Sequence, residues 1–348
     1  MMCYIFYSRK VVYYGQGYTY DVVLGIFFAQ FRFYDPNLRR FLSQDPIKDG
    51  HNWYAAMNNN PITFIDPWGL EPADRSVAFQ QAYGAFIRRF PTPDTFSTED
   101  YIRAHAWLAE IMRLTRDNEG NHVFSQTLLN PRTRANHRPT ISPPITPETG
   151  WYGFNRGFRT AFVNALTAFR EHYGLEQASP NGSVLNQQIW NWLRSKFFEL
   201  LYCQNLHHIN LRWPFQGDWE YASSFGWRDT TGRFHHGADF ALDHGTEVRA
   251  AHRGTVFLTY DQGCGRGHFI RIKCDRGGNF MTVYSHLQEF KVGCGDVVPA
   301  GRLIALSGES GTGCHHLHFE VRTNVGSNWQ EDAWSGFQQN PWMFLPRR

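Results

Sequence analysis

Two histidines that flank a single apolar residue constrain the C-terminal third of the chain more than any other feature. His316, Leu317 and His318 lie in a stretch where Leu317, Phe319 and Val321 alternate with polar residues. Alternation with a period of two is typical of a β-strand with one buried face. Residues two apart in a strand point to the same side. The pattern therefore predicts a strand that presents both histidines side by side.

A second group of metal-ligand residue types occurs earlier in the chain. His235 and Asp239 share the same parity, and Gly237 between them would let the backbone approach a metal closely. With one histidine of the later pair, they would supply two nitrogen donors and one oxygen donor. Three protein ligands leave one tetrahedral position of a zinc ion open, as in catalytic zinc sites. The residues predict a divided Zn2+ site of a hydrolase and leave open whether His316 or His318 is the third ligand.

The surroundings of these residues resemble the lysostaphin/LytM-type zinc metalloendopeptidases over roughly residues 212–345. The segments that carry the resemblance are Ser224 to Arg228, Gly245 to Ala251, Gly254 to Val256, Val297 to Gly301, Ile304 to Gly308 and Gly311 to Glu320. The resemblance implies a small antiparallel β-sheet domain with a groove across one face. It also implies a substrate class, the short peptides that cross-link bacterial peptidoglycan.

The resemblance also implies a role for each residue. His235, Asp239 and His318 would be the zinc ligands, and His286 and His316 the catalytic histidines. A histidine can orient the attacking water, take its proton or protonate the leaving amine, because its ordinary pKa lies near neutral pH. The sequence leaves open which of the two histidines takes which role. Neighbours better explained without a metal role are His236, Cys314 and His315.

Composition excludes some classes of partner and leaves others open. A net charge of +3 is too small to indicate nucleic-acid binding, and no 18-residue apolar run indicates a membrane span. The apolar start, Met1 to Tyr7, precedes the basic residues Arg9 and Lys10, which is the reverse of a secretory signal. Disulfides would suit an oxidising compartment, but the sequence does not choose a pairing among Cys264, Cys274, Cys294 and Cys314.

The first 70 residues differ in composition from the rest of the chain and are rich in aromatic residues and Asp-Pro turns. Phe31 to Asp35 reads as an alternating strand that ends in a turn. Gly25 to Leu70 resembles the end of the Rhs/YD-repeat core, which encloses a C-terminal toxin. The resemblance implies self-cleavage after Leu70 by a pair of aspartates, for which Asp45 and Asp66 are the candidates. The Asp45 motif departs from the family pattern because it lacks the Gly-Leu that follows Asp66.

The middle of the chain reads as helical. Ser97 to Asp100 predicts a helix N-terminus with a capping box, and Phe154 to Tyr173 and Val184 to Leu201 predict two further helices. The expected fold class is α+β and multidomain. The expected domains are an Rhs-core remnant (1–70), a helical region (71–129), a proline-rich linker (130–150), a second helical region (151–211) and the zinc peptidase domain (212–348).

Together these features predict a zinc-dependent endopeptidase that cleaves peptidoglycan cross-links as the tip of an Rhs-type antibacterial toxin. It would be secreted without a signal peptide, through type VI secretion machinery or an Rhs shell, and act in the periplasm or cell wall of a target bacterium. A cognate immunity protein is an expected partner. Two alternatives remain: a hydrolase that remodels the producer's own wall, and a non-catalytic LytM-like module that binds or activates another hydrolase.

Overall fold

The computed structural model describes 14 stretches of the chain, and all structural statements concern them. They are residues 19–21, 25–29, 32–44, 54, 64–65, 73–117, 120–130, 151, 154–173, 185–228, 232–260, 265–275, 279–325 and 336–348. The chain divides into two compact units. One comprises residues 1–89 and 195–208, and the other comprises residues 90–194 and 209–348. No helix in the described stretches is long and apolar enough to span a bilayer.

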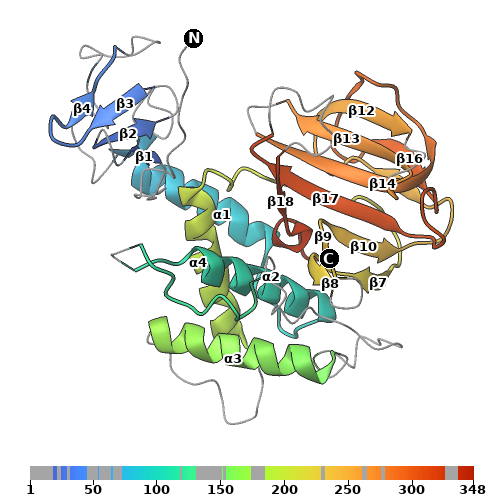
Figure 1. The fold of residues 1–348 in the computed structure, drawn as a ribbon, viewed down its shortest axis with the longest axis horizontal. Helices are drawn as coiled ribbons and strands as arrows, with labels where there is room; N and C mark the ends of the chain where they lie inside the picture. The colour runs from blue at the N-terminus through green and yellow to red at the C-terminus, as the bar shows by residue number, and fades with distance from the viewer. Residues whose placement is uncertain are drawn as a thin grey trace. The chain divides into compact units, whose positions relative to one another are not determined.

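The first unit contains a four-stranded antiparallel sheet near the N-terminus (Figure 1). Tyr34 lies directly across from Phe27 on one side and Phe41 on the other, with ring centroids 6.2 and 5.9 Å away. Such cross-strand aromatic pairs stabilise a sheet beyond the area they bury. The strand predicted at Phe31 to Asp35 is confirmed from Arg32 onward. The elements of this part are β1 (Thr19–Asp21), β2 (Ile26–Ala29), β3 (Arg32–Asp35), β4 (Arg40–Phe41), β5 (Phe64–Ile65), β6 (Ala73–Asp74) and α1 (Arg75–Arg89).

Three further helices follow, α2 (Thr98–Leu114), α3 (Arg156–Tyr173) and α4 (Gln187–Cys203). The predicted capping box at the start of α2 is confirmed. The Ser97 hydroxyl accepts from the Asp100 backbone N–H, and the Asp100 carboxylate accepts from the Ser97 backbone N–H at 2.9 Å. Every residue of α2 from Asp100 to Met112 is buried. A helix buried on all sides lies inside a core rather than on its surface.

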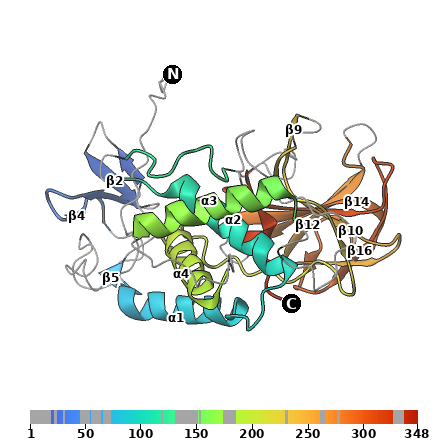
Figure 2. The same ribbon diagram turned by 90° about the horizontal axis from the view of Figure 1, so that it is seen from below.

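Hydrogen bonds hold the last residues of the chain against α2. This helix lies beside the short helix η3 (Pro341–Met343) (Figure 2). Arg103 is fully buried, and it donates from Nε to the Leu345 carbonyl (3.3 Å) and from Nη2 to the Pro346 carbonyl (3.1 Å). Arg347 donates to the buried carboxylate of Asp100 at 3.1 Å. Residues 90–194 belong to the same compact unit as the C-terminal sheet. We call the hydrogen bonds that Arg103 and Arg347 make between α2 and the last residues of the chain the tail clamp.

The C-terminal sheet is antiparallel throughout, which confirms the predicted sheet type. In the described stretches its main path runs β15-β12-β13-β14-β17-β10-β7, and β11, β16 and β18 pair beside it (Figure 1). A separate hairpin consists of β8 (Gly226–Arg228) and β9 (Arg233–His235). The sheet strands are β7 (Glu220–Ser223), β10 (Ala238–Ala241), β11 (Glu247–Arg249), β12 (Gly254–Tyr260), β13 (His268–Cys274), β14 (Phe280–Phe290), β15 (Val297–Val298), β16 (Leu303–Ser307), β17 (Leu317–Thr323) and β18 (Phe337–Gln339).

A buried histidine of α2 makes the stability of this unit depend on pH. The His105 ring packs against Phe158 and Phe162 of α3, and burial lowers its pKa to about 3. The unfolded chain binds a proton at this residue near pH 6.5, so its contribution to stability is complete above that pH and is lost as the pH falls. Between pH 7 and 5 the loss is about 2 kcal/mol.

The measurement is urea denaturation of the wild type and of His105→Gln at both pH values. Between pH 7 and pH 5, the free energy of unfolding of the wild type should fall by about 2 kcal/mol more than that of the variant. Equal losses in the two proteins would contradict a neutral, buried His105.

Candidate metal centre

Two neighbouring antiparallel strands bring two of the predicted ligands together. Asp239 of β10 lies directly across from His318 of β17. Opposed residues have Cβ atoms about 4.5–5.5 Å apart, so both side chains can reach one ion. A Cβ on Gly237 would lie 2.3 Å from the Phe319 carbonyl oxygen. The sequence predicts that this glycine lets the backbone approach a metal; the structure shows instead that it lets the chain entering β10 approach β17.

The third ligand residue comes from a different element. His235 ends β9, so the four-residue spacing from His235 to Asp239 crosses from the hairpin into the large sheet and does not follow one strand. His316 also departs from the predicted arrangement. It lies just before β17, in an isolated bridge with Gly308, while His318 lies within the strand.

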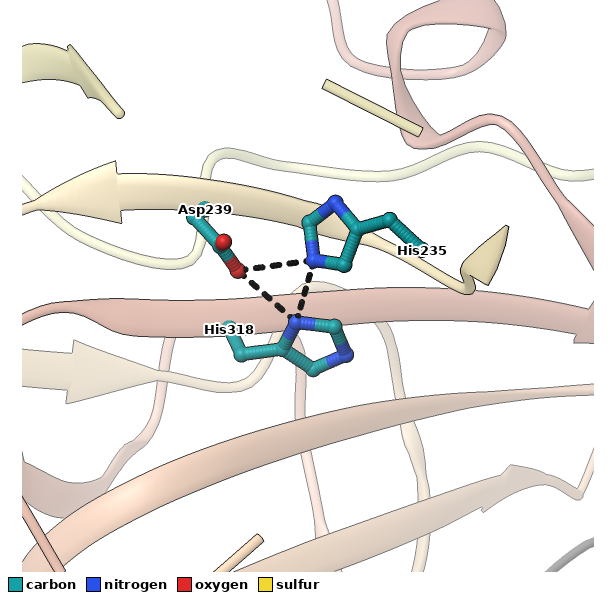
Figure 3. A group of neighbouring side chains, drawn as sticks. All are labelled: His235, Asp239 and His318. Atoms are coloured by element: carbon teal, nitrogen blue, oxygen red, sulfur yellow. Dashed lines mark hydrogen bonds and ion pairs between the residues drawn. The ribbon is translucent and has the colours of Figure 1, made fainter. Parts of the chain in front are cut away.

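The three predicted ligand residues converge on one point (Figure 3). Nε2 of His235 lies 3.0 Å from Oδ1 of Asp239 and 2.9 Å from Nδ1 of His318, and Nδ1 of His318 lies 2.8 Å from Oδ1 of Asp239. All three side chains are buried. Two imidazole nitrogens and a carboxylate oxygen suit zinc, which binds such donors at about 2.0–2.2 Å. In the described stretches these three residues are the group that could hold a metal ion.

A fixed partner holds the far side of each of these three residues. Nδ1 of His235 donates to the Ser224 carbonyl at 2.7 Å, which leaves the lone pair on Nε2 facing the centre. Arg228 donates to Oδ2 of Asp239 at 2.6 Å, so Oδ1 faces the centre. Glu320 pairs through Oε1 with Nε2 of His318 at 3.0 Å. Such outer partners orient metal ligands and fix the tautomers of histidines.

The pKa values of the site show how its charges balance. Burial disfavours the charge on Asp239, but its contacts with the rings of His235 and His318 outweigh this effect and hold the pKa of the carboxyl well below its usual range. Burial also disfavours the protonation of His318, but hydrogen bonds to Asp239 and Glu320 raise its pKa to about 9. Burial lowers the pKa of His235 to about 4. Without a metal, His318 is therefore the cation beside Asp239, and a bound metal ion would displace its proton.

The two predicted catalytic histidines lie beside this group. Their ring centroids are 4.4 Å apart, and the His286 ring is 6.0 Å from that of His318. Nδ1 of His286 donates to the Ser310 carbonyl at 2.9 Å, and Nδ1 of His316 donates to the Cys314 carbonyl at 3.0 Å. A carbonyl can only accept, so the neutral form of each ring has its lone pair on Nε2. Nε2 of His316 lies 3.9 Å from Oδ1 of Asp239.

The backbone conformation of His286 is unusual. Its φ is 65°, in the left-handed region, and the register between β13 and β14 shifts beside it. Bulges of this kind turn a side chain in a new direction next to active sites, and strained residues cluster at functional sites. Burial lowers the pKa of His286 to about 4, so its ring is neutral at neutral pH.

The other residues considered from sequence are not members of the metal group or lie outside the described stretches. His315 is exposed and pairs with Glu309 at 3.5 Å, and the His236 ring lies beside that of Phe234. Of the four cysteines considered for disulfides, Cys274, Cys294 and Cys314 are free thiols. Residues considered from sequence that lie outside the described stretches are Asp45, Asp66, Leu70 and Cys264.

Sequence reasoning missed two residues that contact the ligands, Arg228 and Glu320. Both lie within segments that carry the family resemblance. Glu320 also shares the parity of His318, so the alternation along β17 would have placed it on the same face. No comparable signal exists for Arg228, because its contact with Asp239 depends on how the hairpin folds back toward β10.

Comparison with known proteins agrees with this geometry. Residues 233–330 match the model of Peptidase family M23. Lysostaphin from Staphylococcus staphylolyticus is 35% identical over 98 residues, which are 28% of this chain and 20% of that protein. Peptidoglycan DD-endopeptidase ShyA from Vibrio cholerae serotype O1 is 36% identical over 117 residues, which are 32% of this chain and 26% of that protein.

A further relative is of a different kind. Double-stranded DNA deaminase toxin A from Burkholderia cenocepacia is 46% identical over 52 residues, which are 14% of this chain and 4% of that protein. The chain spans only a fifth to about a quarter of the length of the first three curated relatives that it matches. Residues 233–330 therefore form an M23 peptidase-like domain that resembles lysostaphin.

Proposed function

We propose that the C-terminal domain is a zinc-dependent endopeptidase that hydrolyses the cross-link peptides of peptidoglycan. The observation that carries the proposal is the convergence of His235, Asp239 and His318 within 2.8–3.0 Å of one another. The similarity to lysostaphin and to the peptidoglycan endopeptidase ShyA supports the substrate class. The presence of all three ligand residues favours an enzyme over a LytM-like binding module.

The donor set fits zinc and a hydrolytic reaction. Three protein ligands would leave one position for water or substrate, and bound zinc would lower the pKa of a water molecule to about 7 and polarise the scissile carbonyl. His235 and Asp239 would hold the ion from one side, and His318 would hold it from β17. Burial of these side chains keeps their donor atoms oriented before substrate arrives.

His286 and His316 are the proposed proton carriers. Each ring is held at Nδ1 by a backbone carbonyl, so Nε2 is the atom that can accept or release a proton. One of them would take the proton of the attacking water, and the other would protonate the leaving amine or stabilise the oxyanion. Neither needs to bind the metal for this role.

Substitution of either histidine should slow the reaction and spare the metal. His286→Ala and His316→Ala should each lower kcat/KM by about 10²–10⁴-fold, because general acid and base catalysis supplies that much. Zinc content should stay at the wild-type level. The matched control is His315→Ala, since His315 is exposed and outside the metal group. Loss of zinc together with activity would contradict the assignment and make the histidine a ligand.

The test of the function is product analysis on defined muropeptides by mass spectrometry. The full chain is the right material, because the tail clamp joins α2 to the last residues of the peptidase domain. We expect a peptide bond in the cross-link to be cleaved by the zinc-loaded protein and not by the chelated one. Intact muropeptides from several wall types after treatment with the zinc-loaded protein would overturn the proposal.

We further propose that the enzyme acts as the toxin tip of an Rhs-type antibacterial protein, in the wall or periplasm of a target cell. Support comes from the Asp66 to Leu70 motif and from the 52-residue similarity to a deaminase toxin. Secretion machinery or an Rhs shell would deliver it, and a cognate immunity protein would bind it.

Expression of the protein in bacteria tests this role. Expression directed to the periplasm should stop growth, and cytoplasmic expression should not. Unimpaired growth in both cases would favour a hydrolase that serves the producer's own wall.

A further inference from the structure

Each histidine around the candidate metal centre has one ring nitrogen held by a protein acceptor. For His235, His286 and His316 the acceptor is a backbone carbonyl, at 2.7, 2.9 and 3.0 Å from Nδ1. His318 differs, because its held nitrogen is Nε2 and its acceptor is the side-chain carboxylate of Glu320. The orientation of His318 therefore depends on a side chain, which a substitution can remove.

The position of this carboxylate is itself fixed. Glu320 has no exposed surface. Arg266 approaches Oε1 through Nη2 at 2.7 Å, and Arg322 donates from Nε to Oε2 at 2.7 Å. A buried carboxylate is costly unless it is paired and hydrogen-bonded, and here both oxygens are paired with a guanidinium group. Glu320 is therefore held in place independently of the histidine.

We propose that Glu320, held by Arg266 and Arg322, is a positioning residue that turns Nδ1 of His318 toward the metal position. The proposal rests on the proposed zinc-dependent function. A carboxylate accepts the proton on Nε2, so that Nδ1 keeps the lone pair that a metal needs. Without this acceptor the ring can turn over or adopt its other tautomer. Either change would place a C–H or N–H group where the lone pair has to be.

The test compares zinc affinity of full-length proteins by competition with a chelating dye. Glu320→Met, which removes the acceptor, should bind zinc about 10–100-fold more weakly than the wild type, the loss typical for an outer partner of a metal-bound histidine. Nitrogen-15 NMR of the His318 ring supplies a readout that a purely structural role would not move. In the zinc-loaded wild type Nε2 should carry the proton, and in the variant this single tautomer should be lost.

Two controls keep the result interpretable. Glu289→Met removes an exposed carboxylate of β14 that pairs with Lys291, and it should leave zinc affinity unchanged. Glu320→Met/Arg322→Met keeps the buried charge balanced, so it tests the role of the carboxylate if the single variant fails to fold. It should show the same weakened zinc binding.

The outcomes separate this proposal from the function on which it rests. Wild-type zinc affinity and a single His318 tautomer in a folded Glu320 variant would overturn the role of Glu320 alone. Tight zinc binding by the wild type without cleavage of any muropeptide would overturn the proposed function and leave the role of Glu320 standing. A wild-type chain that takes up no zinc would overturn both.

Discussion

Asp239→Asn is expected to abolish zinc binding and peptidase activity together. Asparagine keeps the shape of the side chain but removes the negative charge that faces His235 and His318. Zinc affinity should fall by more than about 10–100-fold, which is the loss expected when only an outer partner of a ligand is removed. Metal analysis of the purified protein and chelator competition measure the affinity, and muropeptide cleavage measures the activity.

The matched control for this substitution is Asp218→Asn, at an exposed position outside the metal group. It should retain zinc and activity. An Asp239→Asn protein that binds zinc as tightly as the wild type would show that Asp239 is not a ligand. If that protein retained zinc but lost activity, Asp239 would instead belong to the proton-transfer machinery.

Arg103→Met is expected to destabilise the compact unit formed by residues 90–194 and 209–348 by about 3–5 kcal/mol, the cost of breaking a buried ion pair by removing one partner. The substitution leaves the buried carboxylate of Asp100 without one of its guanidinium partners. It also leaves the carbonyls of Leu345 and Pro346 without the donor that holds them to α2. Urea denaturation followed by tryptophan fluorescence measures the change.

Arg253→Met provides the comparison. Arg253 pairs with Asp275 at the surface, where an ion pair contributes about 0–1 kcal/mol. The same change of residue type should therefore have little effect there. Similar losses in both variants, or a loss of under about 1 kcal/mol for Arg103→Met, would contradict a stabilising tail clamp.

The sequence predicts the parts of the site that follow from short-range pattern. Alternation around His318 predicts its strand, and the Ser97 to Asp100 capping box predicts the start of α2, because both depend on residues close in the chain. The side of β17 that carries His318 and Glu320 follows from the same alternation. These features need no knowledge of where distant segments lie.

The sequence does not predict features that depend on segments far apart in the chain. Arg103 would ordinarily be assigned to the solvent face of an amphipathic helix, but two of its partners are the distant carbonyls of Leu345 and Pro346. The left-handed conformation of His286 accompanies a shift of register between two strands. No residue near His286 in the sequence indicates that shift. The contact of Arg228 with Asp239 likewise depends on the path of a hairpin.

The tail clamp has a consequence for the timing of synthesis. Arg103 and Leu345 are 242 residues apart, and a ribosome adds about 5–20 residues per second. Roughly 10–50 s therefore pass between the translation of α2 and the translation of its partners. During that time Arg103 lacks its two carbonyl acceptors and Asp100 lacks its contact with Arg347. The translation of Leu345, Pro346 and Arg347 therefore sets the earliest moment at which this unit can reach its full stability.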